Sequence, residues 1–234
     1  MPVPDAESSP VDDDLVVRLP RQQRSREAWA RILDAGVAVI EDGGYDAFTI
    51  AAVCERADVA PRALYERVNS KDGLFLAVYE HKMNQVTHDQ DALFDDSRWT
   101  QSNPEELIRG AVRAMVELFA PHTAFLRSVI LISGVHPEVY RRGSMYARSL
   151  GDRFTAVVMR AAANIDHADR ETAVRTSFNT AFSALVLRVS YGPGFAAPAV
   201  DDDTFITHLT DMIGSYLLRS TRGPICLPVD RTNV

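Results

Sequence analysis

The sequence predicts an all-α fold, and three observations support this prediction. Apolar residues recur at intervals of three or four along nine segments, which is the spacing of one face of a helix. Capping residues or prolines precede these segments, and glycine or proline often follows them. No segment alternates apolar and polar residues in the manner of a strand, and no internal repeat occurs. We therefore expect nine helices and no sheet.

The composition is typical of a soluble globular protein. The 234 residues are 46% hydrophobic and 24% charged, which supplies ample material for a core. No apolar run approaches the roughly 20 residues of a membrane span, and the N-terminus lacks the pattern of a signal peptide. Cys54 and Cys226 are the only cysteines, so no disulfide framework is indicated. These features predict a cytoplasmic protein with no membrane partner.

The net charge of −7 is unevenly distributed along the chain. Residues 1–17 hold five acids and no base, residues 18–82 hold ten of each, and residues 83–234 hold fifteen bases and seventeen acids. The acidic stretch 1–20 predicts a disordered tail, and residues 221–234 predict a second loose tail.

The first helix is expected from about Arg24 to Glu41. Its core face is formed by five apolar residues at helical spacing: Trp29, Ile32, Leu33, Val37 and Ile40. Gly43 and Gly44 end it, because glycine readily adopts the conformation that terminates a helix.

Two short helices at a sharp angle are expected in residues 49–68. Thr49 is a helix N-cap, and Asp58 sits where the chain must turn. Pro61 suits the first turn of the second helix, while Leu64 and Val68 face inward. This pattern is that of a helix-turn-helix, whose second helix is shaped to enter the major groove of DNA.

Six further helices are expected after this pair. Ser70 caps a long linking helix that ends near Phe94, and a polar loop carrying Trp99 follows. The other five helices are placed at residues 104–121, 122–133, 137–163, 166–191 and 201–219. Their starts are marked by Asn103-Pro104, Pro137, Asp166 with Asp169, and Asp201-Asp202-Asp203.

Residues 24–81 resemble the DNA-binding domain of the TetR family of bacterial transcriptional regulators. The segments SREAWARILDAGVAVIEDGGYDAFT, IAAVCERADV, APRALYERV and NSKDGLFLAVYE follow the family's order and spacing. The chain departs from the family pattern at five positions. Asp58 and Arg62 stand where glycine is common, Ala60 and Ala63 where serine or threonine is common, and Arg67 where histidine is usual.

The resemblance implies two domains and a function. Residues 21–81 are expected to form a three-helix helix-turn-helix DNA-binding domain, and residues 82–220 a six-helix ligand-binding and dimerisation domain. The expected function is that of a ligand-responsive regulator, usually a repressor, that binds a palindromic operator in double-stranded DNA as a homodimer. Its DNA-binding residues are expected to be Arg24, Thr49, Ala60, Arg62, Ala63, Tyr65, Arg67 and Lys71.

In such regulators the last two helices pair with the same helices of a second subunit. Here both helices are apolar on more than one face, which agrees with that role, although a well-buried internal hairpin has the same pattern. The expected interface residues are Ala181, Ala184, Phe205, Leu209 and Met212.

Large apolar residues on successive helices of the second domain predict an effector cavity. They are Met115, Phe119, Phe125, Tyr146, Phe154, Phe178 and Phe182, and the scarcity of charge among them favours a lipophilic or aromatic effector. Each is individually also a plausible core residue. The alternative function is that of a DNA-binding protein controlled by a protein partner, or an architectural one, with a packed second domain.

No catalytic, cofactor or metal motif is present in the sequence. His81 and His88 share a helix face, but two ligands without a third make a poor metal site, so surface or hydrogen-bonded histidines are expected. Asp201, Asp202 and Asp203 are expected to begin a helix rather than to bind a cation. We therefore expect neither an enzyme nor a cofactor.

Overall fold

The computed structural model describes residues 23–65, 67–100 and 103–218, with side chains from Ser25 onward. Both predicted tails lie outside the described residues. Within the described ranges the chain forms nine α-helices and no strand, which confirms the all-α prediction. The helices are α1 (Gln23–Ala47), α2 (Ile50–Ala57), α3 (Pro61–Tyr65), α4 (Lys71–Leu93), α5 (Pro104–Phe119), α6 (Thr123–Ser133), α7 (Pro137–Val158), α8 (Arg170–Tyr191) and α9 (Asp202–Leu218).

The regular part of α1 ends where the two glycines predict it. Gly44 has φ 70° and ψ −169°, which is not helical, so residues 45–47 form a separate short turn. Trp29, Ile32 and Ile40 are buried on the core face of α1. Phe48, which follows the turn, is fully buried and closes the small core.

The turn between α2 and α3 has the predicted geometry. Thr49 Oγ1 accepts a hydrogen bond from the Ala52 backbone N–H at 3.0 Å. Asp58 adopts the left-handed conformation, with φ 52° and ψ 53°. The α3 helix is shorter than predicted, but the Val68 N–H still donates to the Leu64 carbonyl at 3.1 Å, so a helical turn continues beyond Tyr65. Leu64 and Val68 are fully buried as expected.

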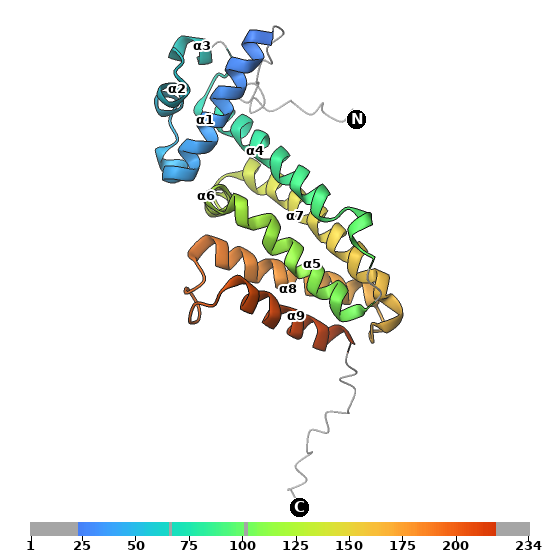
Figure 1. Cartoon of the computed structure of the whole chain (residues 1–234). Helices are drawn as coiled ribbons and strands as arrows, with labels where there is room; N and C mark the ends of the chain where they lie inside the picture. The colour runs from blue at the N-terminus through green and yellow to red at the C-terminus, as the bar shows by residue number, and fades with distance from the viewer. Residues whose placement is uncertain (1–22, 66, 101–102, 219–234) are drawn as a thin grey trace, which may run out of the picture.

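The second domain, α5 to α9, is a helical bundle against which α4 lies lengthwise (Figure 1). The α5 helix packs against α7, α8 and α9, and α8 and α9 lie side by side away from α4 (Figure 1). Asn103 caps α5 and Asp201 caps α9, both as predicted. Trp99 is buried and stacks on Phe94, with ring centroids 5.8 Å apart, which seals the end of α4.

The start of α8 differs from the prediction. Asp169, not Asp166, is the N-cap, and its carboxylate accepts from the Thr172 N–H at 3.1 Å. The Asp166 N–H instead donates to the Leu217 carbonyl at 2.9 Å, so a contact with the end of α9 keeps this residue outside the helix.

One apolar segment, Pro104–Ser133, is long and apolar enough to cross a membrane by length and composition alone. The expectation that no segment has this character is therefore wrong. In the structure the segment is divided, because α5 ends at Phe119 and α6 begins at Thr123, with Pro121 in the turn between them. Figure 1 shows α6 nearly end-on while α5 runs across the view. Both helices pack within the bundle, as core helices of a soluble protein do.

Candidate nucleic-acid interface and internal cavity

The turn and the outer side of α3 form an exposed surface. Ala60, Arg62, Ala63 and Tyr65 are all exposed, and Tyr65 is 57% exposed although it is a large aromatic residue. Among the described residues no hydrogen bond or ion pair holds the Arg62 guanidinium. This surface therefore offers a cation, a phenol and two small side chains to a partner outside the chain.

Two of the predicted DNA-binding residues are engaged within the domain. Arg67 donates to the Ser25 hydroxyl and lies over Trp29, with its guanidinium carbon 6.0 Å from the ring centroid. Lys71, the first residue of α4, has its Nζ 4.2 Å above the ring of Tyr45. Thr49 caps α2, and the side chain of Arg24, within α1, lies outside the described residues. Ala60, Arg62, Ala63 and Tyr65 thus remain as exposed predicted DNA-binding residues, and Arg62 and Tyr65 are the two with polar side chains.

A cavity of about 280 Å³ lies between α4 and helices α5 to α8. Its wall is almost wholly apolar and carries no charged side chain. The lining residues are Tyr79, Met83, Val86, Gln90, Leu118, Phe119, Leu126, Val129, Ile130, Ser133, Val139, Tyr140, Gly143, Ser144, Tyr146, Ala147, Leu150, Phe182 and Val186. This volume is slightly smaller than the range of about 300–1,000 Å³ that is typical of small-molecule sites.

Three of the seven predicted cavity residues line this space: Phe119, Tyr146 and Phe182. The other four do not: Met115, Phe125, Phe154 and Phe178 are buried elsewhere in the core. Phe154 and Phe178 pack on each other with centroids 5.6 Å apart, and Phe178 also fills the space over Gly151. Phe154 and Phe178 therefore fill space in the core and do not form part of the cavity wall.

The sequence analysis missed the contribution of α4 to the cavity. Tyr79, Met83, Val86 and Gln90 are spaced by four, three and four residues, so they form one stripe along the helix. In the sequence, the signal for this wall was a polar glutamine, Gln90, at helical spacing from the apolar residues of the stripe. Gln90 is 5% exposed and its Nε2 donates to Ser149 Oγ at 3.1 Å.

A polar network beside the cavity joins α4 to α7. The Tyr146 hydroxyl donates to Glu80 Oε2 at 2.9 Å, and Arg142 pairs with Glu80 Oε1 at 2.5 Å. Glu138 accepts from both Arg141 and Arg142. Burial and the hydrogen bond to Glu80 raise the pKa of Tyr146 to about 12. Hydrogen bonds from Arg141 and then Arg142 lower the pKa of Glu138 to about 2.

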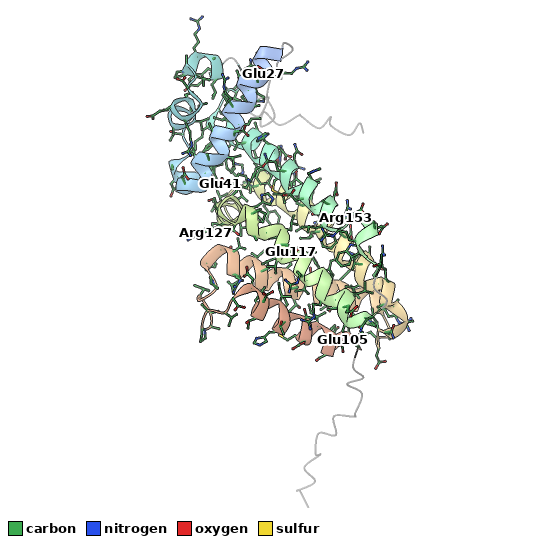
Figure 2. The ribbon with its side chains drawn as sticks, viewed as in Figure 1. Glu27, Glu41, Glu105, Glu117, Arg127 and Arg153 are labelled. Carbon is green, nitrogen blue, oxygen red and sulfur yellow. The ribbon has the colours of Figure 1, made fainter. Side chains whose placement is uncertain are left out.

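The same helix α4 is also tied to α1. His81 Nε2 lies 2.7 Å from Asp34 Oδ1, and Lys82 Nζ lies 3.2 Å from Glu41 Oε1. Figure 2 marks Glu41 on the part of α1 nearest the second domain. Ser128 on α6 adds a second link, because its hydroxyl donates to the Ile40 carbonyl at 3.3 Å. Helix α1, which these contacts hold against α4 and α6, packs in turn on α2 of the helix-turn-helix.

The histidine pair does not form a metal centre. His81 is bonded to Asp34, and His88 is exposed about two turns further along α4. Within the described part of the chain, no group of three or more His, Cys, Asp or Glu side chains is placed to hold a metal ion. Asp201 accepts from the Thr204 N–H at 2.7 Å, which is the capping role expected for the acidic run.

The predicted interface residues of α8 and α9 divide into two groups. Ala181 and Leu209 are buried inside the single chain, so little of either side chain is exposed to a second subunit. Ala184 and Phe205 are partly exposed, and Met212 is 62% exposed. Leu187, Tyr191 and Tyr216 add exposed apolar surface on the same two helices.

Comparison with known proteins agrees with this architecture. Residues 32–78 match the family model described as bacterial regulatory proteins, tetR family. The transcriptional repressor KstR of Mycolicibacterium smegmatis is 39% identical over 64 residues, which is 27% of this chain and 31% of that protein. The A-factor receptor protein of Streptomyces griseus is 31% identical over 71 residues, 30% of this chain and 26% of the receptor. These alignments span about a third or less of the curated relatives.

Solved structures extend the similarity to the second domain. A TetR-family transcriptional regulator from Mesorhizobium loti superposes with a TM-score of 0.63 at 15% identity, over 83% of this chain and 97% of that one. A Rhodococcus regulator of the same family gives a TM-score of 0.60 at 14% identity, over 81% and 98%. The DNA-binding domain of this chain therefore belongs to the TetR family of bacterial regulatory proteins, and the chain as a whole has the fold of that family's regulators.

Proposed function

We propose that this protein is a ligand-responsive transcriptional regulator, acting as a repressor. It binds a palindromic operator in double-stranded DNA as a homodimer in the cytoplasm. A small, uncharged and lipophilic molecule enters the cavity and releases it from the operator.

One observation carries the proposal: α4 belongs to both functional parts. Its first half is tied to α1 by the pairs of Asp34 with His81 and Glu41 with Lys82. The stripe from Tyr79 to Gln90 on the same helix forms one wall of the cavity. A ligand that displaces this wall moves the helices to which the recognition helix is attached, and so shifts the population between DNA-competent and incompetent states.

The cavity favours a small-molecule effector over control by a protein partner. A packed second domain would leave no internal volume, whereas here about 280 Å³ is open beside α4. The absence of charged side chains among the lining residues disfavours a charged effector, because an unpaired charge in an apolar site costs several kcal/mol or more.

Selection from a random pool of DNA duplexes tests the DNA-binding half. The purified chain is expected to enrich a palindrome whose two half-sites lie about one helical turn apart, and to bind it far more tightly than random duplex. A chain carrying Tyr65→Ala and Arg62→Ala together, both on the exposed side of α3, serves as the matched control. Failure to enrich any sequence would reject operator binding.

A further inference from the structure

The hydroxyl of Tyr79 lies at the cavity wall and makes no hydrogen bond to another described residue. Tyr79 is 1% exposed and lines the cavity. Among the described residues no acceptor is hydrogen-bonded to its Oη. An incoming acceptor can therefore bind this hydroxyl without breaking an internal hydrogen bond.

The space beside this hydroxyl is left open by a glycine. Gly143 on α7 also lines the cavity, and a Cβ at this position would lie 3.7 Å from Tyr79 Oη. A side chain at position 143 would be in van der Waals contact with the hydroxyl, and the glycine leaves this side of Oη uncovered. Glycine in the middle of a helix lowers the stability of that helix. At position 143 it also leaves the Tyr79 hydroxyl facing the cavity.

The other donors around the cavity are already used or reach solvent. The Tyr146 hydroxyl donates to Glu80 at 2.9 Å, and Gln90 donates to Ser149 at 3.1 Å. The hydroxyls of Ser133 and Ser144 donate to carbonyls of their own helices, at 2.6 and 2.8 Å. Tyr140 is 67% exposed and can bind water. Among the hydroxyls of the wall, that of Tyr79 is thus the one that makes no hydrogen bond within the described chain and lies on a side chain shielded from solvent.

The chemistry of the wall defines the acceptor. Burial raises the pKa of Tyr79 above its ordinary value, so the phenol stays protonated and donates. No lining residue carries a charge that could pair with a carboxylate or phosphate. The acceptor must therefore be a neutral oxygen, such as the carbonyl of a ketone or an ester.

We propose that the cavity binds an elongated, uncharged, mostly hydrocarbon ligand whose carbonyl oxygen accepts a hydrogen bond from Tyr79 Oη. This assignment rests on the proposed function, in which the cavity is the effector site. The lining stripe of α4 runs from Tyr79 to Gln90, which is roughly 16 Å of helix. The carbonyl lies at the Tyr79 end, next to the part of α4 that is tied to the DNA-binding domain.

A ketone and its matched hydrocarbon test this assignment. The probes are 4-cyclohexylcyclohexanone and bicyclohexyl, titrated into the full chain by calorimetry in a fixed co-solvent. Wild type is expected to prefer the ketone. Tyr79→Phe keeps the ring and removes only the hydroxyl, so ketone binding should weaken about tenfold while hydrocarbon binding stays unchanged.

Tyr45→Phe is the matched control, because Tyr45 does not line the cavity and its hydroxyl donates to Asp72 Oδ1 at 3.0 Å. This variant should keep the ketone preference and lose thermal stability without ligand. Tyr79→Phe should keep its thermal stability, since no internal hydrogen bond is removed.

Two outcomes would overturn the assignment. If Tyr79→Phe retains the full preference for the ketone, the carbonyl does not meet Tyr79, although the cavity can still be the effector site. If neither probe binds wild type, both the ligand assignment and the effector part of the proposed function fail. Operator selection is carried out without ligand, so the DNA-binding part is judged separately.

Discussion

At the scale of single residues, the turn of the helix-turn-helix shows how local chemistry fixes the backbone. Asp58 occupies a left-handed conformation with φ 52°, at a position where the family commonly has glycine. Aspartate tolerates this region better than most other L-residues, so the fold survives the replacement. The caps at Thr49 and Ser70 were likewise predictable, because a cap depends on atoms within three residues.

Arg62 and Lys71 are expected to have different tasks on DNA. Arg62 is exposed in the first turn of α3, and its guanidinium can bridge O6 and N7 of guanine. Arg62→Ala should cost about 1–3 kcal/mol on the operator and relax the preference at one guanine in each half-site. Lys71→Ala should weaken binding to all sequences alike and reduce the salt dependence by about one charge per subunit.

The measurement is binding to a library of singly substituted operators at two salt concentrations. Lys71 lies over the Tyr45 ring, so the thermal stability of Lys71→Ala must be checked in parallel. A uniform loss across the library for Arg62→Ala would make this residue a phosphate contact instead of a base reader.

At the scale of helices, Gly36 sets the distance between α1 and α4. A Cβ at position 36 would lie 2.4 Å from Val78 Cγ2, and Val78 is fully buried with a stiff, branched side chain. Gly36→Ala should therefore destabilise the protein by about 1–3 kcal/mol, despite the better helix propensity of alanine. Operator affinity should fall with it, because α1 must move off the linking helix.

Thermal unfolding checks this expectation, with Gly134→Ala as the control. A Cβ at position 134 would meet no neighbouring atom within 4 Å, and Gly134 has a right-handed φ of −67°, so an added methyl group meets no obstacle. Equal melting temperatures for Gly36→Ala and wild type would mean that α1 and α4 can separate without cost.

The network between α4 and α7 should give a pH-dependent stability. The pKa of Glu138 is lowered from 4.5 to about 2 by hydrogen bonds from Arg141 and Arg142. A lowered carboxyl pKa stabilises the fold above pH 4.5, and this contribution is lost as the pH falls toward 2. Glu138→Gln should therefore cost about 1 kcal/mol at pH 7, since the group is partly exposed, and progressively less between pH 4.5 and 2.

Urea unfolding at several pH values measures this difference between wild type and variant. Glu117→Gln is the control for loss of a negative charge, because Glu117 on α5 is exposed and has no ion pair among the described residues (Figure 2). A wild-type advantage over Glu138→Gln that does not shrink in acid would exclude the ionised carboxylate as its source.

The cavity shows why elements are easier to predict than sites. Helix faces follow from spacing along one segment, and the buried faces of α1, α4 and α5 match it. A cavity exists where side chains of several helices fail to meet, which depends on their relative positions. Phe125 and Phe154 are residues of the type that often lines a ligand site, yet both are fully buried among other side chains. Gly143 contributes to the cavity because it has no side chain to fill the space beside Tyr79. A search of the sequence for large apolar residues does not find such a position.

At the scale of the whole molecule, the exposed side of α8 and α9 is the expected interface of the homodimer. Met212 is 62% exposed and Ala184 is partly exposed, and the exposed Leu187, Tyr191 and Tyr216 lie on the same two helices. A C2 interface of about 2,000 Å² in total would cover this surface and set the separation of the two recognition helices. Two half-sites on DNA require two such helices.

Ala184→Asp and Met212→Asp should each yield folded monomers that no longer bind the operator tightly, because each places a charge in an apolar contact without a partner. Size-exclusion chromatography with light scattering gives the mass, and gel shift on the selected palindrome gives the affinity. Met145→Asp is the matched control, since Met145 is 58% exposed but lies on α7. It should remain dimeric and bind DNA as wild type does. If both Ala184→Asp and Met212→Asp remain dimeric, the interface lies on another face of the bundle. That other interface would then determine the distance between the two recognition helices, and with it the spacing of the half-sites.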